Sequence, residues 1–260
     1  RRAGSPVFVN GAQQADAVQR KVADDLQEMR NQRDNSIEWL CAQSLTGTIA
    51  YQVEPHENYL ITIPRPATHV FNAPVFWDDA DPTLPNPEQD AHLVKRIMSE
   101  NPGLSPTHCL LGTEAADALI NLSKRQGFLF DKRRLNDGNI TLQTQFEESG
   151  AIYLGRAFGI DFWEYSRVLS LPVSNGGGTV NLIRPKYAEF IHVGPAADRR
   201  LYFGSIPDMT ALQNNAHVAE LFVKSWVDED PSQITYLLHS RPLPWPRRAN
   251  TWVSVKVVSG

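Results

Sequence analysis

The longest hydrophobic pattern in the chain covers residues 12–46 and is typical of a single helix. Its apolar residues recur at intervals of three and four, and they are Val18, Val22, Leu26, Met29, Ile37, Leu40, Cys41 and Leu45. Gly47 is a natural C-terminal stop. The stripe is narrow and is interrupted by the polar segment 30–36, so we expect the helix to lie along a surface or against partner chains. A coiled coil is the alternative, but the stripe is too short for several heptads.

The next two segments change character. Residues 48–63 contain two β-branched and aromatic runs around the polar turn EPHEN, which predicts a β-hairpin. Residues 64–87 carry six prolines and few regular signals, so they are interpreted as an extended connector and a domain boundary.

Residues 88–204 have the pattern of a mixed α/β unit. The apolar face formed by Ala91, Val94, Ile97 and Met98 predicts a helix over 88–101. A second helix is predicted over 113–127. Strands are predicted over 107–112, within 151–166, over 188–194 and over 199–206.

The C-terminal region returns to strand patterns. Residues 234–240 and 251–258 are predicted strands, and the proline-rich segment 241–250 lies between them. They resemble the hairpin 48–63 in character. We therefore expect one small β domain built from 48–63 and 226–258, with the α/β unit inserted between its halves.

Composition is that of an ordinary folded protein. The chain has 260 residues, 42% of them hydrophobic, and a net charge of −4, which excludes wholesale disorder and a broadly basic nucleic-acid-binding face. Short basic pairs such as Arg199–Arg200 and Arg247–Arg248 are interpreted as solvated turns. The two cysteines, Cys41 and Cys109, fit small buried hydrophobes in a reducing compartment. No apolar run is long enough for a membrane span.

Candidate chemistry is sparse. Asp78, Asp79 and Asp81 could offer oxygen ligands to a hard cation, but a solvated acidic turn is the favoured interpretation. The seven histidines show no helical metal spacing, and no nucleophile elbow or phosphate loop occurs. We therefore predict no catalytic, cofactor-binding or metal residues, and no enzyme activity.

The order of the elements, together with three segments, resembles one protein family. SGAIYLGRAFGIDFWEY has the spacing Y-x-G-x-x-x-G-x-x-x-x-x-Y, and LYFGSIPDM resembles a short Y-G-x-I-x-D strand. The C-terminal segment FVKSWVDEDPSQITYLLHSRPLPWPRRANTWVSVKV resembles the C-terminal tail of the same family. This chain has Val223 where the family tail has a proline, and Arg241 where it has an alanine. Over about residues 20–258 the sequence is therefore similar to the major capsid protein E family of lambda-type tailed phages.

The resemblance implies an α+β fold of the Hong Kong 97 type. Its peripheral domain would comprise 12–87 and 221–260, with a spine helix at 12–46, the hairpin and the tail strands. Its axial domain would be 88–220. Residues 1–11 would be the remnant of an extended loop, and we expect that a longer N-terminal segment normally precedes Arg1, since the chain does not begin with methionine.

The implied function is that of a structural head protein of a phage or prophage, in the virion capsid. It would self-assemble into pentamers and hexamers of an icosahedral shell in the host bacterial cytoplasm and touch packaged DNA only weakly and non-specifically. Scaffold, portal and decoration proteins are the implied partners, and no membrane is involved. The sequence shows no matched set of lysine, asparagine and glutamate, so we predict no covalent crosslink between subunits. The alternatives are an encapsulin-like cellular shell protein and a metal-assisted hydrolase that uses residues 78–81.

A long helix offers places for aromatic anchors at subunit interfaces. Trp39, beside Glu38, is a candidate for such an anchor, although packing of Trp39 within the core is at least as good an interpretation. The predicted subunit-contact residues are Trp39, Glu38, Phe8, Trp245 and Arg247.

Overall fold

The computed structural model describes residues 11–54, 57–126, 150–170, 178–206, 208–213, 219–228 and 233–260. The chain divides into two compact units, Arg1–Ile37 with Tyr202–Leu243 and Glu38–Leu201 with Pro244–Gly260. Phe8 lies outside the described residues. The long helix α1 spans Gly11–Thr46, which confirms the helix predicted over 12–46. It ends at Gly47, whose positive φ of 90° is readily adopted by glycine.

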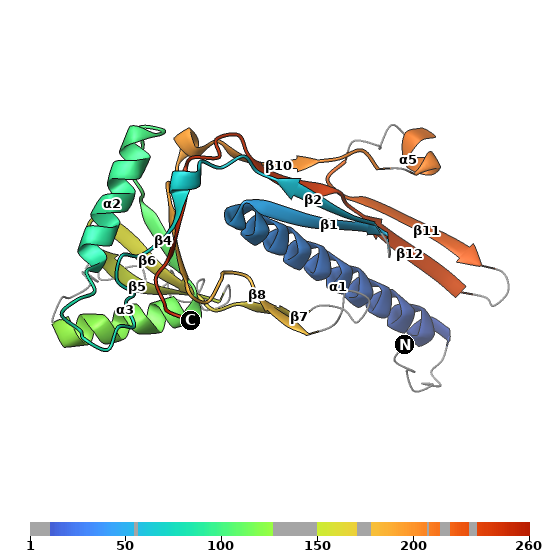
Figure 1. The fold of residues 1–260 in the computed structure, drawn as a ribbon. Coiled ribbons are helices and arrows are strands. Elements are labelled where there is room, and N and C mark those ends of the chain that lie inside the picture. Colours follow the sequence, from blue (N-terminus) through green and yellow to red (C-terminus); the bar gives the residue numbers. More distant parts are fainter. Residues whose placement is uncertain are drawn as a thin grey trace. The chain divides into compact units, whose positions relative to one another are not determined.

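The larger unit is organised around a mixed six-stranded sheet (Figure 1). Its strands are, in spatial order, β3 (Val70–Asn72), β14 (Trp252–Lys256), β9 (Tyr187–Ile191), β4 (His108–Leu111), β6 (Ile160–Tyr165) and β5 (Ala151–Ala157). The pairs β3–β14 and β4–β6 are parallel, and the other neighbours are antiparallel.

One face of this sheet is covered by the helices α2 (Pro87–Glu100) and α3 (Thr113–Gln126). Val94, Met98, Leu119 and Leu122 of the helices pack with alternate residues of the strands in one hydrophobic core. Phe162 and Phe190 meet edge to face in it, with ring centroids 6.3 Å apart. Burial of this face is the main stabilising contribution within the unit.

The turn between β4 and α3 needs a glycine. A side chain at Gly112 would meet the backbone carbonyl of Arg184 at 2.1 Å, which no real side chain tolerates. The Gly112 N–H donates to the carbonyl of Tyr187 at 3.1 Å. This close approach places the segment that precedes β9 directly against the start of α3.

The predicted connector 64–87 is part of this unit rather than a free link. It contributes the strand β3, and Trp77 is completely buried in the core. The Trp77 indole donates a 2.8 Å hydrogen bond to the buried carboxylate of Asp90 on α2. Burial raises the pKa of Asp90, and the Trp77 hydrogen bond opposes that shift.

Several two-stranded ribbons complete the fold. They are β1 (Thr48–Glu54) with β2 (Glu57–Thr62), β7 (Val168–Ser170) with β8 (Thr179–Asn181), β10 (Arg199–Phe203) with β13 (Pro242–Pro246), and β11 (Phe222–Asp228) with β12 (Gln233–His239). The first ribbon confirms the hairpin predicted over 48–63. Two short 3₁₀ helices, η1 (Ala67–His69) and η4 (Pro195–Ala197), lie in connections of the larger unit.

The smaller unit contains most of α1, the β11–β12 ribbon and the short helix α5 (Met209–Gln213). Within residues 19–37 the stripe Val22, Leu26, Met29 and Ile37 is only half-buried. Among the unit's described side chains, Ile206 and Pro242 alone are buried. The described residues of this unit therefore form no hydrophobic core comparable to that beside the six-stranded sheet.

Two features of the C-terminal region differ from the expected strand pairing. Residues 252–256 pair with β9 and β3 in the six-stranded sheet, not with the hairpin 48–63. The proline-rich stretch Pro242–Pro246 is itself a strand, β13. Its three prolines alternate, so their missing N–H groups fall on one edge, and the opposite edge stays free to pair with β10. The proposed domain boundaries remain a prediction.

The part of the chain that the structure describes contains no helix with the length and hydrophobicity needed to cross a membrane.

Candidate functional site

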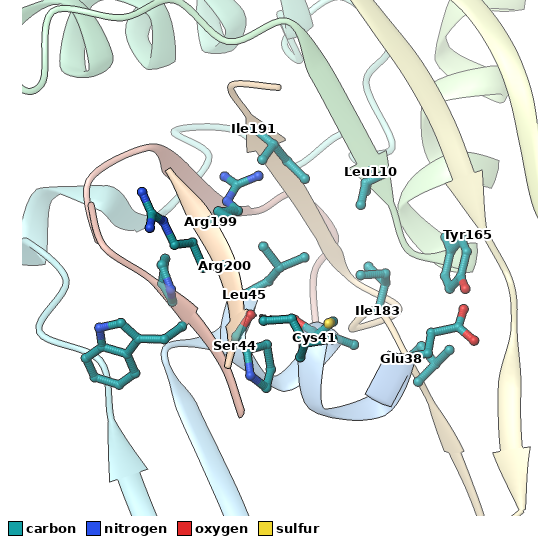
Figure 2. A pocket seen from close by; sticks show the side chains of 16 residues that line it. Glu38, Cys41, Ser44, Leu45, Leu110, Tyr165, Ile183, Ile191, Arg199 and Arg200 are labelled. Atoms are coloured by element: carbon teal, nitrogen blue, oxygen red, sulfur yellow. Dashed lines mark hydrogen bonds between the residues drawn. The ribbon is translucent and has the colours of Figure 1, made fainter. Parts of the chain in front are cut away.

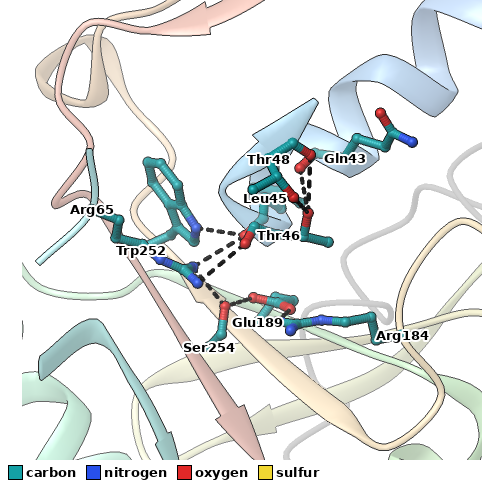
Figure 3. A network of polar contacts seen from close by, with 9 residues as sticks. All are labelled: Gln43, Leu45, Thr46, Thr48, Arg65, Arg184, Glu189, Trp252 and Ser254. Carbon is teal, nitrogen blue, oxygen red and sulfur yellow. Dashed lines mark hydrogen bonds and ion pairs between the residues drawn. The ribbon is translucent and has the colours of Figure 1, made fainter. Parts of the chain in front are cut away.

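The C-terminal end of α1 lies against the sheet face opposite α2 and α3, where a polar network holds it (Figure 3). The Trp252 indole donates to the carbonyl of Leu45 at 2.8 Å. The Arg65 guanidinium donates to the same carbonyl at 3.1 Å and to that of Thr46 at 3.4 Å. The last carbonyls of a helix lack partners within the helix and carry partial negative charge, so a cation there is stabilising. The last turn of α1 has no basic residue, and Arg65 supplies the charge.

The network continues to a buried carboxylate, that of Glu189 on β9. Arg65 donates to the hydroxyl of Ser254 at 2.7 Å, and that hydroxyl in turn donates to Glu189. Arg184 donates to the other carboxylate oxygen at 2.5 Å. Burial lowers the pKa of Arg65, Glu189 opposes this, and Arg184 adds to it. Because Glu189 is paired and hydrogen-bonded, the charge buried in the sheet is compensated. We call these residues, with Trp252, the helix-end network.

A pocket of about 380 Å³ opens beside this network, and all its lining residues belong to the larger unit (Figure 2). Its lining is mainly apolar, with Ala42 and Leu45 from α1, Leu110 and Ile191 from the sheet, and Pro244 from β13. Glu38 and Tyr165 lie at one side, and Arg199 and Arg200 at the other. The exposed thiol of Cys41 also lines it. We call this the helix-end pocket.

The two arginines of the pocket differ in their partners. Arg200 forms an ion pair with Asp198 at 2.8 Å. No carboxylate of the described residues pairs with Arg199, which donates only long hydrogen bonds of 3.3 and 3.4 Å to the carbonyl and hydroxyl of Thr251. Desolvation lowers the pKa of Arg199 to about 10. Arg199 is nevertheless an exposed residue, and its guanidinium lies 5.7 Å from the centroid of the Trp252 ring, so solvent and an aromatic face both contact this cation.

A second surface of functional interest is the β11–β12 ribbon, in the smaller unit. The register pairs Val223 with Leu238, Ser225 with Tyr236 and Val227 with Ile234, so these six side chains share one face. Five of the six are apolar or aromatic. Val227 is 66% exposed and Ile234 53% exposed. An apolar face of this kind on a protein surface is typical of an interaction site.

The sequence matches the family model described as Phage major capsid protein E over residues 1–257, which is almost the whole chain. The chain belongs to the phage major capsid protein E family. Its role is therefore that of a structural capsid protein of a phage or prophage, which implies a place in the virion capsid, self-assembly and no enzymatic task.

Two solved structures were compared with this capsid protein, and one of them shares its fold. A proposed prophage capsid protein from E. coli CFT073 aligns with a TM-score of 0.77 and 21% identity, over 99% of this chain and 74% of that one. The likeness confirms the mixed α+β class. A phage-related protein from Bordetella bronchiseptica RB50 aligns with a TM-score of 0.48 and 15% identity, over 98% of this chain and 70% of that one. No curated protein matches the sequence.

The structure places four of the five predicted contact residues, and their surroundings differ. Glu38 lines the helix-end pocket and pairs with Arg167, and half-buried Trp245 lines the same pocket. Trp39 is half-buried outside it. Arg247 is exposed and lies 3.3 Å from the carboxylate of Asp198. Their role in subunit contacts remains a prediction, as does that of Phe8 outside the described residues.

The carboxylates of the acidic cluster, Asp78, Asp79 and Asp81, accept hydrogen bonds from N–H and hydroxyl groups of the same chain. Asp78 accepts hydrogen bonds from the N–H and hydroxyl of Ser259, near the C-terminus. Asp81 accepts from the N–H and hydroxyl of Thr83, and Asp79 accepts from the N–H of Asp81. Within the described residues no group of three or more His, Cys, Asp or Glu side chains converges as metal ligands would. The contacts of Asp79 and Asp81 are those of turns, whereas Asp78 fixes the distant C-terminal segment, and neither kind of contact supports the hydrolase alternative.

Sequence reasoning missed the helix-end network. One signal was present, since Glu189 is a charged residue inside an otherwise apolar strand, and such a residue needs a buried partner. Arg65 gave no such signal, because it is separated from Ser254 by the whole inserted α/β region.

Proposed function

We propose that this capsid protein forms the pentameric and hexameric capsomers of an icosahedral shell that encloses DNA. The fold would be of the Hong Kong 97 type, with α1 as the spine helix. Residues 12–87 and 221–260 would form the peripheral domain, 88–220 the axial domain, and 1–11 the remnant of an extended loop. In this division β3 and β14 complete the sheet of the axial domain, which would tie the two domains together.

The observation that carries this proposal is the exposed apolar face of the β11–β12 ribbon. A two-stranded ribbon is at best marginally stable in water without a further layer against it. No described side chain of β11 or β12 is buried, although five of the six on one face are apolar or aromatic. A protein whose function is structural gains from such a face when another copy covers it.

The charge of the chain fits a container for DNA. A net charge of −4 disfavours tight binding to phosphates, so DNA contact would be weak and non-specific. Assembly would take place in the host bacterial cytoplasm, where two unpaired cysteines remain reduced. Scaffold, portal and decoration proteins are the partners we propose for a complete head.

The test is the size of the particles that the chain forms. We would measure mass by light scattering after gel filtration and image the same fractions by negative-stain electron microscopy, over a range of salt and protein concentration. Rings of five or six subunits, or closed shells, are expected. Monomers under every condition would contradict the proposal.

A variant pair makes this test specific to the ribbon. Val227→Asp combined with Ile234→Asp places charges on the apolar face and should leave monomers. Leu84→Asp is the control, because Leu84 is 55% exposed in a loop of the larger unit. Circular dichroism of all three proteins checks that each is folded. If the ribbon variant assembles like the control, the ribbon face is not an assembly surface.

A further inference from the structure

The strand β12, with the sequence QITYLLH, differs from the other described strands that lie at the edge of a sheet. An open edge can pair with another chain, and proteins normally prevent this with charged residues, proline, a bulge or a very short strand. In this structure β3, β7 and β8 have three residues each, β13 contains prolines, β1 and β5 have irregular registers, and β2, β10 and β11 contain charged residues. Strand β12 has none of these features, and its register with β11 is regular over seven residues.

The outer edge of β12 is open in the described part of the chain, where only β11 pairs with this strand. Two apolar side chains of β12 are exposed, Ile234 to 53% and Leu237 to 38%. A segment of about seven residues with strong β propensity and low charge is an aggregation hazard when it lies open at an edge. We therefore expect another strand to cover this edge in the assembled protein.

We propose that β12 of one copy pairs antiparallel with β12 of a second copy, about a two-fold axis at Tyr236. The register follows from strand length, since centring on Tyr236 gives all seven residues of β12 a partner. Tyr236 then lies opposite its own counterpart, and Thr235 lies opposite Leu237 of the second copy. Ile234 lies opposite Leu238 in the same way. This inference rests on the proposed self-assembly and adds one contact surface to it.

A second copy of β12 suits this edge because the strand can face itself without repulsion. It contains no Asp, Glu, Lys or Arg, so no like charges meet across the axis. By contrast β11 contains Lys224, which forms an ion pair with Asp208 at 3.0 Å. In the proposed register Ile234 and Tyr236 stay on the same face as their counterparts. The two ribbons thus become one wider sheet with a continuous apolar face, which is more stable than an isolated ribbon.

The contact is isologous, because the same strand meets itself across a two-fold axis. Rings of five or six copies are built from heterologous contacts, in which two different surfaces meet. A closed shell also needs contacts that join one ring to the next, and the pairing of β12 with β12 is of a kind that can do so. One strand pair is smaller than the roughly 1,200 Å² of a stable interface, so it should add to the ring contacts and associate only weakly alone.

A disulfide at the proposed axis tests the pairing directly. Opposite residues of an antiparallel pair have Cα atoms about 4.5 or 5.5 Å apart, which a disulfide can span. Tyr236→Cys should therefore form a covalent dimer under mild oxidation, seen on a denaturing gel. The background is Cys41→Ser, because Cys41 is exposed whereas Cys109 is buried. Ser225→Cys is the matched control, since Ser225 is exposed and pairs with Tyr236 within the chain but lies one strand farther from the axis.

The outcomes separate this proposal from that of capsid assembly. Dimers from Tyr236→Cys, with few or none from Ser225→Cys, support the pairing. If wild-type chains form rings or shells but Tyr236→Cys gives no more dimer than the control, the pairing is overturned and the assembly proposal stands. If Tyr236→Cys dimers form although the wild type builds neither rings nor shells, the pairing stands and the assembly proposal fails. Fibrils that bind thioflavin T in place of discrete dimers would assign the edge to aggregation and overturn the pairing.

Charges placed across the axis test the register without thiols. Thr235→Lys combined with Leu237→Lys sets like charges opposite each other on the two copies and should weaken association by about tenfold. Thr235→Glu combined with Leu237→Lys sets opposite charges at the same places, so it should associate at least as well as the wild type. Sedimentation velocity of concentrated protein measures association, and circular dichroism checks that each variant is folded. Equal association of the two variants would contradict the proposed register.

Discussion

The two compact units of this capsid protein bury their apolar side chains to very different extents. In the larger unit, α2, α3 and one face of the six-stranded sheet enclose a continuous core. In the smaller unit, only Ile206 and Pro242 are buried among the described residues. A helix with a half-buried stripe and a two-stranded ribbon cannot form a core of their own. The difference indicates that the larger unit is stabilised by its own core, whereas the described residues of the smaller unit leave most of their apolar side chains at least partly exposed.

Two ribbons of similar length also differ in how far their side chains are buried. The β1–β2 ribbon begins directly after α1 and is fixed to the larger unit, where Ile49 is completely buried. The β11–β12 ribbon has the same antiparallel pairing, yet no described side chain in it is buried. Ribbon pairing alone therefore does not tell whether a ribbon belongs to the core or is available to a partner. Side-chain burial does.

The largest effect is expected in the core of the larger unit. Leu119 on α3 is completely buried among α2 and the sheet. Leu119→Ala removes apolar contacts and leaves a cavity, which should lower the free energy of unfolding by about 3 kcal/mol. Urea denaturation followed by circular dichroism measures this. Leu237→Ala on the exposed ribbon is the matched control, and an equal cost at both positions would remove the distinction between the two units.

A smaller effect is expected at the helix-end network. Arg65→Met keeps an apolar stem but removes the donors to Leu45 and Ser254 and the cation at the end of α1. The loss should be about 2 kcal/mol, the range for hydrogen bonds that involve a charged group. The same denaturation experiment measures it. Arg65→Lys keeps the charge but not the planar fork of donors, so its free energy of unfolding should lie between those of the wild type and Arg65→Met. If Arg65→Met lowers the free energy of unfolding by less than Leu237→Ala does, the network does not hold the helix.

Local patterns predicted the elements well, and long-range pairing limited the rest. The helix 12–46 and the hairpin 48–63 follow from residue periodicity and turn chemistry, which act within a few residues. The placement of residues 252–256 between β9 and β3 depends on contacts across more than 60 positions of sequence, so periodicity could not reveal it. Strand β13 was hidden because proline is usually read as a breaker, although alternating prolines leave one edge able to pair.

The candidate site was less predictable than the fold for a related reason. Glu38 and Trp245 were singled out as aromatic or charged residues on extended elements, and both line the helix-end pocket. Arg199 was interpreted as a solvated turn residue, and the structure has it exposed, but at the start of strand β10 and beside the helix-end pocket. Which residues line one pocket depends on contacts between distant segments, so the sequence alone could not bring Arg199 and Glu38 together.

The smallest effect on stability is expected at the ribbon tip, where the effect on assembly should be large. Val227→Thr keeps the β-branched shape and the strand preference, and Val227 is 66% exposed. The free energy of unfolding of the single chain should therefore change by less than about 0.5 kcal/mol. If the tip is buried against a second copy, the hydroxyl must lose water there, and association should weaken while stability does not. Denaturation of dilute monomer and sedimentation of concentrated protein separate the two quantities. A loss of stability comparable to that of Leu119→Ala would mean that the ribbon already packs within its own chain, and the contrast between the two units would not hold.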